Sequence, residues 1–204
     1  MNRKAHWDEV YSNKSPLEVS WYQKEPALSL QLIEHTGIST HAAIIDIGGG
    51  ASILVDHLNE RGYQHLAVLD ISGNALAYAK KRLASAADHI EWFESDITAF
   101  QSPHQFDLWH DRAVFHFLTA ASDRERYVET LQRTLKPGGH LIMAAFAIGG
   151  PSKCSGLDIV QYDAGKLLTE LGSSFTLLEE DSEIHVTPTE KAQQFAYFRF
   201  IKAE

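Results

Sequence analysis

The protein has 204 residues, of which 44% are hydrophobic and 22% charged, so we expect one large, soluble globular domain. A formal charge of -9 with no run of Lys or Arg opposes nucleic-acid binding, and no apolar stretch reaches the ~20 residues that a membrane span needs. One cysteine and 11 scattered histidines show no metal-ligand spacing, so we expect neither a disulfide nor a bound metal.

The first 42 residues predict two helices, near Lys4–Tyr11 and Pro26–Glu34, joined by an aromatic stretch that contains Trp21 and Tyr22. The beginning of the chain is polar and lacks the apolar core of a signal peptide, which favours a cytoplasmic location. We interpret residues 1–42 as a helical lid and not as a separate domain.

Residues 43–147 alternate short apolar runs with helical patterns and form the predicted cofactor-binding core. Such alternation indicates parallel βαβ units with helices on both faces of one sheet. Five strands are expected, over Ala43–Ile47, His65–Leu69, Ile90–Phe93, Phe106–Trp109 and Leu141–Phe146. Three helices are expected between them, over Ile53–Arg61, Ala75–Leu83 and Asp123–Leu135, the last of which stops at Lys136-Pro137-Gly138-Gly139.

Residues 148–204 depart from this alternation. A long loop over Ile148–Asp163 and a helix precede two strands, Phe175–Val186 and Gln193–Ile201, which a short turn at Thr187–Thr189 joins. This arrangement predicts a terminal hairpin with one antiparallel strand. The fold class is therefore α/β, a doubly wound Rossmann-like sheet within a single domain spanning 1–204.

A glycine-rich turn, Asp46-Ile47-Gly48-Gly49-Gly50, follows the first strand, where doubly wound folds bind their ligands. A dinucleotide fingerprint needs a third glycine at position 53, which is isoleucine here, so an NAD-dependent oxidoreductase is the weaker alternative. S-adenosylmethionine carries no pyrophosphate, and its methionine part needs small residues and a nearby acid such as Asp46 for its ammonium.

Two further acids follow the next two strands. Asp70, within Asp70-Ile71-Ser72, is placed to accept hydrogen bonds from two ribose hydroxyls. Asp96 is placed to accept from an adenine amino group while Ile97 packs on the ring. The alternative for each acid is a helix cap, because aspartate favours that position.

With these motifs the sequence resembles the class I S-adenosylmethionine-dependent methyltransferases, whose signature is an acid with a glycine turn followed by acids after strands two and three. The resemblance covers roughly residues 40–147. It implies a seven-stranded sheet in the order 3-2-1-4-5-7-6 with strand 7 antiparallel. It also implies S-adenosylmethionine as the cofactor and methyl transfer to an acceptor as the reaction.

Four polar residues after the fourth strand are the candidate catalytic groups: His110, Asp111, Arg112 and His116. Methyl transfer from a sulfonium needs an aligned acceptor lone pair and, for some acceptors, removal of one proton, which histidine or aspartate can perform. Arg112 is suited to hold an anionic acceptor. The structural alternatives are an Asp111–Arg112 ion pair and histidines packed in the core.

Two subfamilies share parts of this region. Trp109 followed by Asp111-Arg112-Ala113 is similar to the Trp-Asp-Arg-Gly stretch of thiopurine and related chalcogen methyltransferases, with His110 inserted. Trp7-Asp8 and the aromatic stretch at Trp21-Tyr22 resemble small protein-lysine methyltransferases. The acceptor is therefore expected to be a small molecule or a protein side chain.

Three interpretations of Trp21 and Tyr22 stay open: they cover the cofactor, they form an aromatic cage over a cationic acceptor, or they pack between the helices. A third functional hypothesis is a module that binds S-adenosylmethionine without catalysis. Binding without turnover would identify it.

Overall fold

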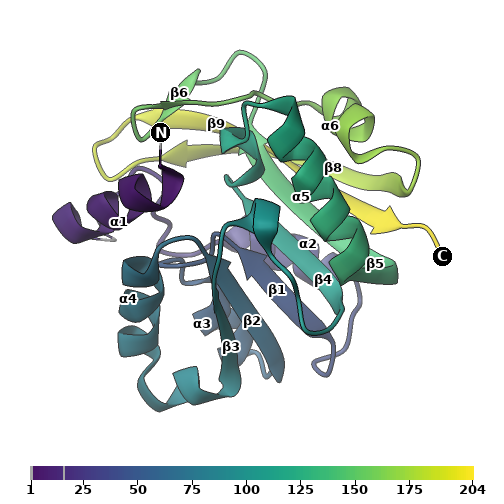
Figure 1. The fold of residues 1–204 in the computed structure, drawn as a ribbon, viewed down its shortest axis with the longest axis horizontal. Coiled ribbons are helices and arrows are strands. Elements are labelled where there is room, and N and C mark those ends of the chain that lie inside the picture. Colours follow the sequence, from purple (N-terminus) through teal and green to yellow (C-terminus); the bar gives the residue numbers. More distant parts are fainter. Residues whose placement is uncertain (1, 16) are drawn as a thin grey trace.

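A seven-stranded mixed sheet organises the computed structural model, which describes residues 2–15 and 17–204 (Figure 1). Its strands stand in the order β3-β2-β1-β4-β5-β9-β8, and β9 runs antiparallel to both β5 and β8. Counted within this sheet alone, the order is the predicted 3-2-1-4-5-7-6, so the fold prediction is confirmed. The strands are β1 (Ala43–Ile47), β2 (His65–Asp70), β3 (Ile90–Glu94), β4 (Phe106–Arg112), β5 (Leu135–Phe146), β8 (Phe175–Val186) and β9 (Ala192–Lys202).

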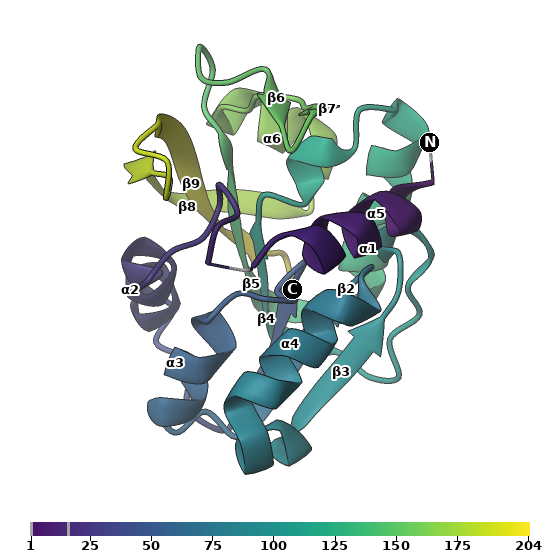
Figure 2. The same ribbon diagram turned by 90° about the vertical axis from the view of Figure 1, so that its left-hand side faces the viewer.

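Helices cover both faces of this sheet, and each face has its own hydrophobic core (Figure 2). Successive side chains of a strand point to opposite faces, so in β4 Leu108 joins one core and Trp109 the other. One face carries α2 (Ala27–His35), α3 (Leu54–Glu60) and α4 (Gly73–Leu83), and the other carries α5 (Ala121–Thr134) and α6 (Ala164–Leu171). Short 3₁₀ turns lie at η1 (Ala84–His89), η2 (Ile97–Ala99) and η3 (Phe115–Phe117).

Polar side chains cap the first turns of α4 and α6. The Ser72 hydroxyl accepts from the backbone N–H of Ala75 at the start of α4, and the Asp163 carboxylate accepts from that of Lys166 at the start of α6. Each cap satisfies a backbone donor that has no partner within the helix.

Strands β4 and β5 are both longer than expected. β4 continues three residues beyond Trp109 to Arg112, and β5 begins at Leu135 instead of Leu141. The Lys136–Gly139 segment is a bulge within β5. Phe106 of β4 pairs with Leu135, and the next paired residue, Leu108, pairs with His140, so the residues between Leu135 and His140 have no partner in β4. Gly138 has φ +70, which lets the chain make this detour.

The expectation of a helical lid over residues 1–42 is wrong for α2. Leu30, Leu32 and Ile33 are buried in the core on the α3 face, so α2 is a structural layer of the sheet. Helix α1 (Arg3–Asn13) has no buried residue and lies beside α4 at one edge of the sheet (Figure 2). Residues 1 and 16, which belong to the predicted lid, lie outside the described residues.

The segment after β5 is more ordered than a loop. It contains a small antiparallel hairpin, β6 (Lys153–Cys154) with β7 (Leu157–Asp158), and Ala147 forms a bridge with Tyr162. Within the described residues, no helix has the combined length and apolar character that a bilayer crossing requires.

Candidate active site

The glycine turn leaves the carboxyl end of β1 in a space too small for side chains. Gly48 has φ +67, and a Cβ atom there would overlap the side chain of Val114, which follows β4. A Cβ atom at Gly49 would lie 2.6 Å from Asp46 Cγ, closer than real carbon contacts. These two positions therefore require glycine, and a turn without side chains is suited to close approach of a ligand to its backbone.

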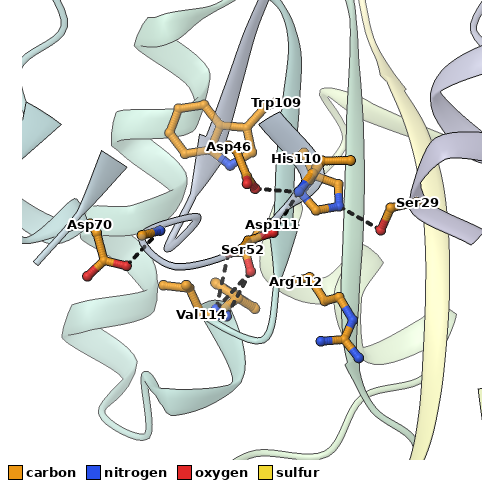
Figure 3. Close-up of polar contacts among 12 residues, drawn as sticks. Ser29, Asp46, Ser52, Asp70, Trp109, His110, Asp111, Arg112 and Val114 are labelled. Carbon is orange, nitrogen blue, oxygen red and sulfur yellow. Dashed lines mark hydrogen bonds and ion pairs between the residues drawn. The ribbon is translucent and has the colours of Figure 1, made fainter. Parts of the chain in front are cut away.

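Asp46 is buried, with only one of its two carboxylate oxygens hydrogen-bonded. Its Oδ1 pairs with His110 Nδ1 at 2.7 Å, and His110 Nε2 pairs with the Ser29 hydroxyl at 2.9 Å (Figure 3). Asp46 Oδ2 is buried without a partner. A buried carboxylate oxygen is costly to leave unpaired, so this atom is suited to a donor on a bound ligand.

Asp70, at the end of β2, is tied to the turn after β1. Its Oδ2 accepts from Gly50 N at 3.1 Å and its Oδ1 accepts from Ser72 N at 2.8 Å. Burial raises the pKa of Asp70 from 3.8 to about 7, because removal from water penalises the charged form. The hydrogen bonds from Ser72 and Gly50 partly offset this rise in pKa, and the carboxylates of Asp46 and Asp8 contribute to it.

Asp96 begins the short turn η2, so its helix-cap interpretation is correct in part. Its Oδ1 accepts from the backbone N–H and the hydroxyl of Thr98 at 2.9 and 2.8 Å. Its Oδ2 lies 3.3 Å from Arg3 Nη2 of α1. Ile97, the next residue, is buried beside it.

A cavity lies along the carboxyl ends of β2, β3 and β4, and its empty space, open solvent included, is about 830 Å³. One end holds groups suited to a nucleoside, and the other end is dominated by aromatic side chains. The nucleoside end is lined by Gly48, Asp70, Ile71, Ser95, Asp96 and Ile97. The aromatic end is lined by Trp7, Trp21, Phe117, Phe146 and Phe195, together with Arg112.

A second cavity adjoins the first, and the two share Tyr11, Trp21, Gly48 and Arg112 as lining residues. The second cavity is also lined by Tyr22, Asp46, Gly49, Ile53 and His110. Most of the predicted cofactor residues thus lie in two places. Some line the nucleoside end of the first cavity, and others line the second cavity, among them Asp46 with its unpaired oxygen.

Two predicted cofactor residues line neither described cavity and act through Asp70. The Gly50 N–H holds the Asp70 carboxylate, and a Cβ atom at this position would lie 2.6 Å from that of Ala75. Ser72 is fully buried, and its hydroxyl caps α4 and donates to Asp8 Oδ1 at 2.7 Å. Direct contact of Ser72 with a cofactor is therefore not supported.

Helix α1 is held against the nucleoside end by polar contacts. Besides the Asp8–Ser72 bond, Asn74 donates to the backbone oxygen of Asp8, and Lys4 Nζ lies 2.9 Å from Glu94 Oε1. Trp7 and Tyr11, one helical turn apart on α1, both line the first cavity. Their i, i+4 spacing indicates a common face, but the sequence does not say what that face covers.

Asp111 points away from both cavities, on the face of the sheet opposite to His110. Its carboxylate accepts from Tyr127 Oη at 2.5 Å, Val114 N at 2.8 Å and Phe115 N at 3.1 Å (Figure 3). It is fully buried, and burial raises its pKa to about 6. Asp111 forms no ion pair with Arg112 and lines neither described cavity, and its hydrogen bonds hold the loop after β4.

We expect Asp111→Ala to lower the free energy of unfolding by about 3 kcal/mol, because one hydroxyl and two backbone donors lose their buried acceptor. Urea unfolding measures this. Asp111→Asn, which keeps one acceptor oxygen, should lose less, and Asp88→Ala, at an exposed position, should lose almost nothing. If Asp111→Ala were as stable as the wild type but had no turnover, Asp111 would instead be a catalytic residue.

His116 is also removed from the cavities. It is fully buried between Phe117 and Phe146, with ring centroids 4.4 and 4.9 Å apart, and neither of its ring nitrogens has a hydrogen-bond partner. Burial lowers its pKa to about 3, so the ring is neutral at physiological pH. His116 is therefore packed in the core, as one of the alternatives from the sequence proposed. It differs from a hydrogen-bonded core histidine because both of its ring nitrogens are unpaired.

Arg112 is the one predicted catalytic residue that lines both described cavities. Its Nε donates to Tyr197 Oη at 2.8 Å and its Nη1 to the backbone oxygen of Trp21 at 3.1 Å. Its Nη2 is buried without a hydrogen bond, 3.7 Å from Glu183 Oε2. Figure 3 shows its side chain extending away from Asp111.

The cavity residues that the sequence did not identify come from distant parts of the chain. Cys154 of β6 and Phe195 of β9 line its aromatic end, with Gln193 beside Phe195. No local motif marks them, and Phe195 reaches this edge only through the pairing of β9 with β5. Among the described residues, no group of three His, Cys, Asp or Glu side chains is arranged to hold a metal ion.

A family model described as a methyltransferase domain matches residues 44–139, which run from β1 into β5 and include the glycine turn, Asp70 and Asp96. The sheet order with an antiparallel strand inserted beside β5 agrees with this match. Residues 44–139 are thus similar to a methyltransferase domain, and the chain has the seven-stranded fold of the class I S-adenosylmethionine-dependent methyltransferases.

Particular relatives are all distant. Nodulation protein S of Rhizobium tropici is 31% identical over 104 residues, which cover 51% of this chain and 43% of the relative. The ubiquinone/menaquinone biosynthesis C-methyltransferase UbiE of Hahella chejuensis is 25% identical over 163 residues, 75% of this chain and 64% of the relative. The chain therefore spans less than two thirds of the length of these curated relatives.

Solved structures show the same fold. The N-methyltransferase NodS from Bradyrhizobium japonicum, in complex with S-adenosyl-L-homocysteine, has a TM-score of 0.70 at 20% identity, covering 97% of this chain and 98% of that one. A structure described by the conversion of a disulfide bond into a thioacetal group during echinomycin biosynthesis has a TM-score of 0.77 at 18% identity, covering 97% and 90%.

Proposed function

We propose that the protein binds S-adenosylmethionine along the carboxyl edge of β1, β2 and β3 and transfers its methyl group to an acceptor in the aromatic end of the first cavity. The observation that carries the proposal is the convergence of a side-chain-free glycine turn, an unpaired Asp46 oxygen and the Asp70 carboxylate at one edge. The names of the relatives, among them N- and C-methyltransferases, support the same reaction type.

The chain's own residues fit each part of this cofactor. Asp46 Oδ2 would accept from the ammonium of the methionine part, with Gly48 and Gly49 supplying backbone approach, while Tyr22 lines the same cavity. Asp70 would accept from the ribose hydroxyls, next to Ile71. Asp96 and Ile97 would bind the adenine, and Trp21 lines both cavities between the two ends of the cofactor.

When bound, the cofactor supplies a methyl group that is already activated by a sulfonium. The protein then needs to align the acceptor and exclude water, which aromatic walls and helix α1 are suited to do. A cytoplasmic location and the absence of a nucleic-acid or membrane partner stay predictions from the sequence.

Calorimetry with S-adenosylmethionine, S-adenosylhomocysteine and NADH tests the cofactor. We expect heat from the first two and none from NADH, and the reverse pattern would support the oxidoreductase alternative. A tritiated methyl donor added with a cell extract, separated into protein and small-molecule fractions, then tests transfer. Tight binding with no labelled product in either fraction would support a non-catalytic module instead.

The raised pKa of Asp70 predicts that cofactor binding depends on pH. Ribose hydroxyls donate to the ionised carboxylate, so binding favours loss of the proton that Asp70 holds below pH about 7. The affinity for S-adenosylhomocysteine should therefore rise as pH increases through about 7 and level off above it, with a slope of up to about tenfold per pH unit below that value. Calorimetry from pH 6 to 8.5 measures it.

The same group has the opposite effect on the stability of the unliganded protein. Because its folded pKa of about 7 exceeds the unfolded value of 3.8, its contribution is fully present below 3.8 and is lost as pH rises through about 7. Both trends should disappear in Asp70→Asn, which does not titrate. An affinity in the wild type that is independent of pH would show that Asp70 is already ionised or does not contact the cofactor.

A further inference from the structure

We propose that the methyl acceptor is a small, flat aromatic molecule that carries an anionic oxygen or sulfur, held by Arg112 in the aromatic end of the first cavity. The proposal rests on the proposed methyl transfer and names the substrate class of that site. It also separates the two acceptor types left open by the sequence, a small molecule and a lysine side chain.

Aromatic side chains from five different segments form the walls of this end. Trp7 of α1 meets Trp21 and Phe117 edge-on, with ring centroids 5.6 and 5.0 Å apart and interplanar angles of 84° and 77°. Phe146 of β5 and Phe195 of the neighbouring strand β9 pack against each other, with ring centroids 4.7 Å apart. Such contacts fix the rings and present apolar surface that suits a flat, apolar ligand.

Arg112 places a positive charge within these walls. Its side chain is 10% exposed and lies over the Phe195 ring, 4.4 Å from the ring centroid. Two of its nitrogens are occupied by Tyr197 and Trp21, and Nη2 keeps a free donor. A buried guanidinium with an unused donor favours an anionic acceptor such as a phenolate or thiolate.

Glu183 does not remove this preference. Its carboxylate accepts from Tyr197 Oη at 2.9 Å and from Gln23 Nε2 at 2.9 and 3.1 Å, and it stands 3.7 Å from Arg112 Nη2. Glu183 lines neither described cavity. The carboxylate therefore stands beyond hydrogen-bonding distance of Nη2, which stays an unused donor on a residue that lines the cavity.

Gln193 adds a second unpaired polar atom to the same end. Its Oε1 is buried without a hydrogen-bond partner and can accept from an N–H or O–H on the ligand. The nearby thiol of Cys154 stays protonated, because burial raises its pKa to about 11. The cavity thus offers one cationic donor and one neutral acceptor within apolar walls.

No base is available to this end among the described residues. The carboxylates of the lining, Asp70 and Asp96, stand at the nucleoside end, and His110 is hydrogen-bonded to Asp46 and Ser29 in the second cavity. His116 lines neither cavity. An ammonium such as that of lysine would meet the charge of Arg112 and find nothing to take its proton.

An acceptor that is already anionic needs no base. Its lone pair forms the bond to the methyl carbon, the bond between that carbon and the donor sulfur breaks, and the electron pair of the broken bond stays on sulfur. The anion and the sulfonium give a neutral methylated product and a neutral thioether, so no proton moves and the reaction balances.

The test measures binding of para-nitrophenol to the protein saturated with S-adenosylhomocysteine, because the phenolate and the phenol differ in absorbance. We expect the phenolate to bind about tenfold more tightly than the phenol, which lowers the apparent pKa of the bound probe. Benzylamine, a cation of similar shape, should not displace it. Labelled methyl transfer to thiophenol but not to benzylamine is the expected activity result.

Three variants identify the source of this preference. Arg112→Gln should abolish the difference between phenolate and phenol, and Arg112→Lys should keep part of it because the charge remains. Arg124→Gln is the matched control, because Arg124 is a half-buried arginine paired with Glu170 outside both cavities, and it should behave as wild type. Thermal unfolding verifies that each variant is folded, and affinity for S-adenosylhomocysteine is measured separately.

Several outcomes would overturn the proposal while leaving the proposed function intact. One is normal binding of S-adenosylhomocysteine with equal or stronger binding of phenol and benzylamine. Another is a large loss of S-adenosylhomocysteine affinity in folded Arg112→Gln with an unchanged probe pKa, which would place Arg112 on the carboxylate of the cofactor. Failure to bind S-adenosylhomocysteine at all would instead contradict the proposed function itself.

Discussion

Asp70→Ala is expected to weaken the binding of S-adenosylhomocysteine by about 100-fold. In the proposed site the Asp70 carboxylate accepts hydrogen bonds from two ribose hydroxyls. Each hydrogen bond to a charged group contributes about 1.5–3 kcal/mol to the free energy of binding. Asp70 also holds the backbone N–H groups of Gly50 and Ser72, so the substitution releases the turn after β1 from β2. Calorimetry at pH 8, where the wild-type carboxylate is ionised, gives the comparison.

The contribution of the ligand contact can be separated from that of the turn. Asp70→Asn keeps one side-chain oxygen for the backbone donors and loses the charge, so we expect it to be intermediate in affinity and near wild type in thermal unfolding. Asp88→Ala, at an exposed position, should leave both unchanged. If Asp70→Ala bound S-adenosylhomocysteine as tightly as the wild type, Asp70 would not contact the cofactor.

Gly49→Ala is expected to weaken S-adenosylhomocysteine binding by about 10- to 100-fold while the protein still folds. The added methyl would lie 2.6 Å from Asp46 Cγ, and Asp46 cannot retreat, because it is buried and paired with His110 at 2.7 Å. Overpacking of this kind costs about 1–3 kcal/mol. The backbone of Gly49 does not have positive φ, so the effect reports space and not strain.

Gly165→Ala is the matched control for this experiment. Gly165 lies in the first turn of α6, and an added Cβ atom would be 3.5 Å from Asp163 Oδ1, an ordinary contact. Alanine favours a helix over glycine by about 1 kcal/mol, so this variant should be slightly more stable, with unchanged affinity. Equal affinities of Gly49→Ala and wild type would show that the ligand does not approach the turn.

The positions of the three acids could be predicted because they depend on local pattern and one topological rule. Asp46, Asp70 and Asp96 each follow an apolar run that is recognisable as a strand, and parallel strands end at the same edge of a sheet. The glycine turn was recognisable for the same reason. The fold class and the resemblance to a methyltransferase family followed from these features together.

The polar residues at the end of β4 could not be assigned to a face of the sheet in this way. His110, Asp111 and Arg112 are consecutive, so two of them face one side of the sheet and one faces the other. Which side holds the cavity depends on α2 and α5, which come from distant parts of the sequence. The prediction of four catalytic groups therefore included both Asp111, which is hydrogen-bonded to Tyr127, and Arg112, which lines the cavity.

The sequence by itself determined the sheet and the edge at which the glycine turn and the three acids lie, because strand patterns and strand ends are local properties. The tertiary structure decided what surrounds the acceptor. Trp7, Phe146 and Phe195 are brought together around Arg112 only by the packing of α1 and the pairing of β9 with β5. These contacts are long-range, so no spacing of residues along the chain encodes them visibly.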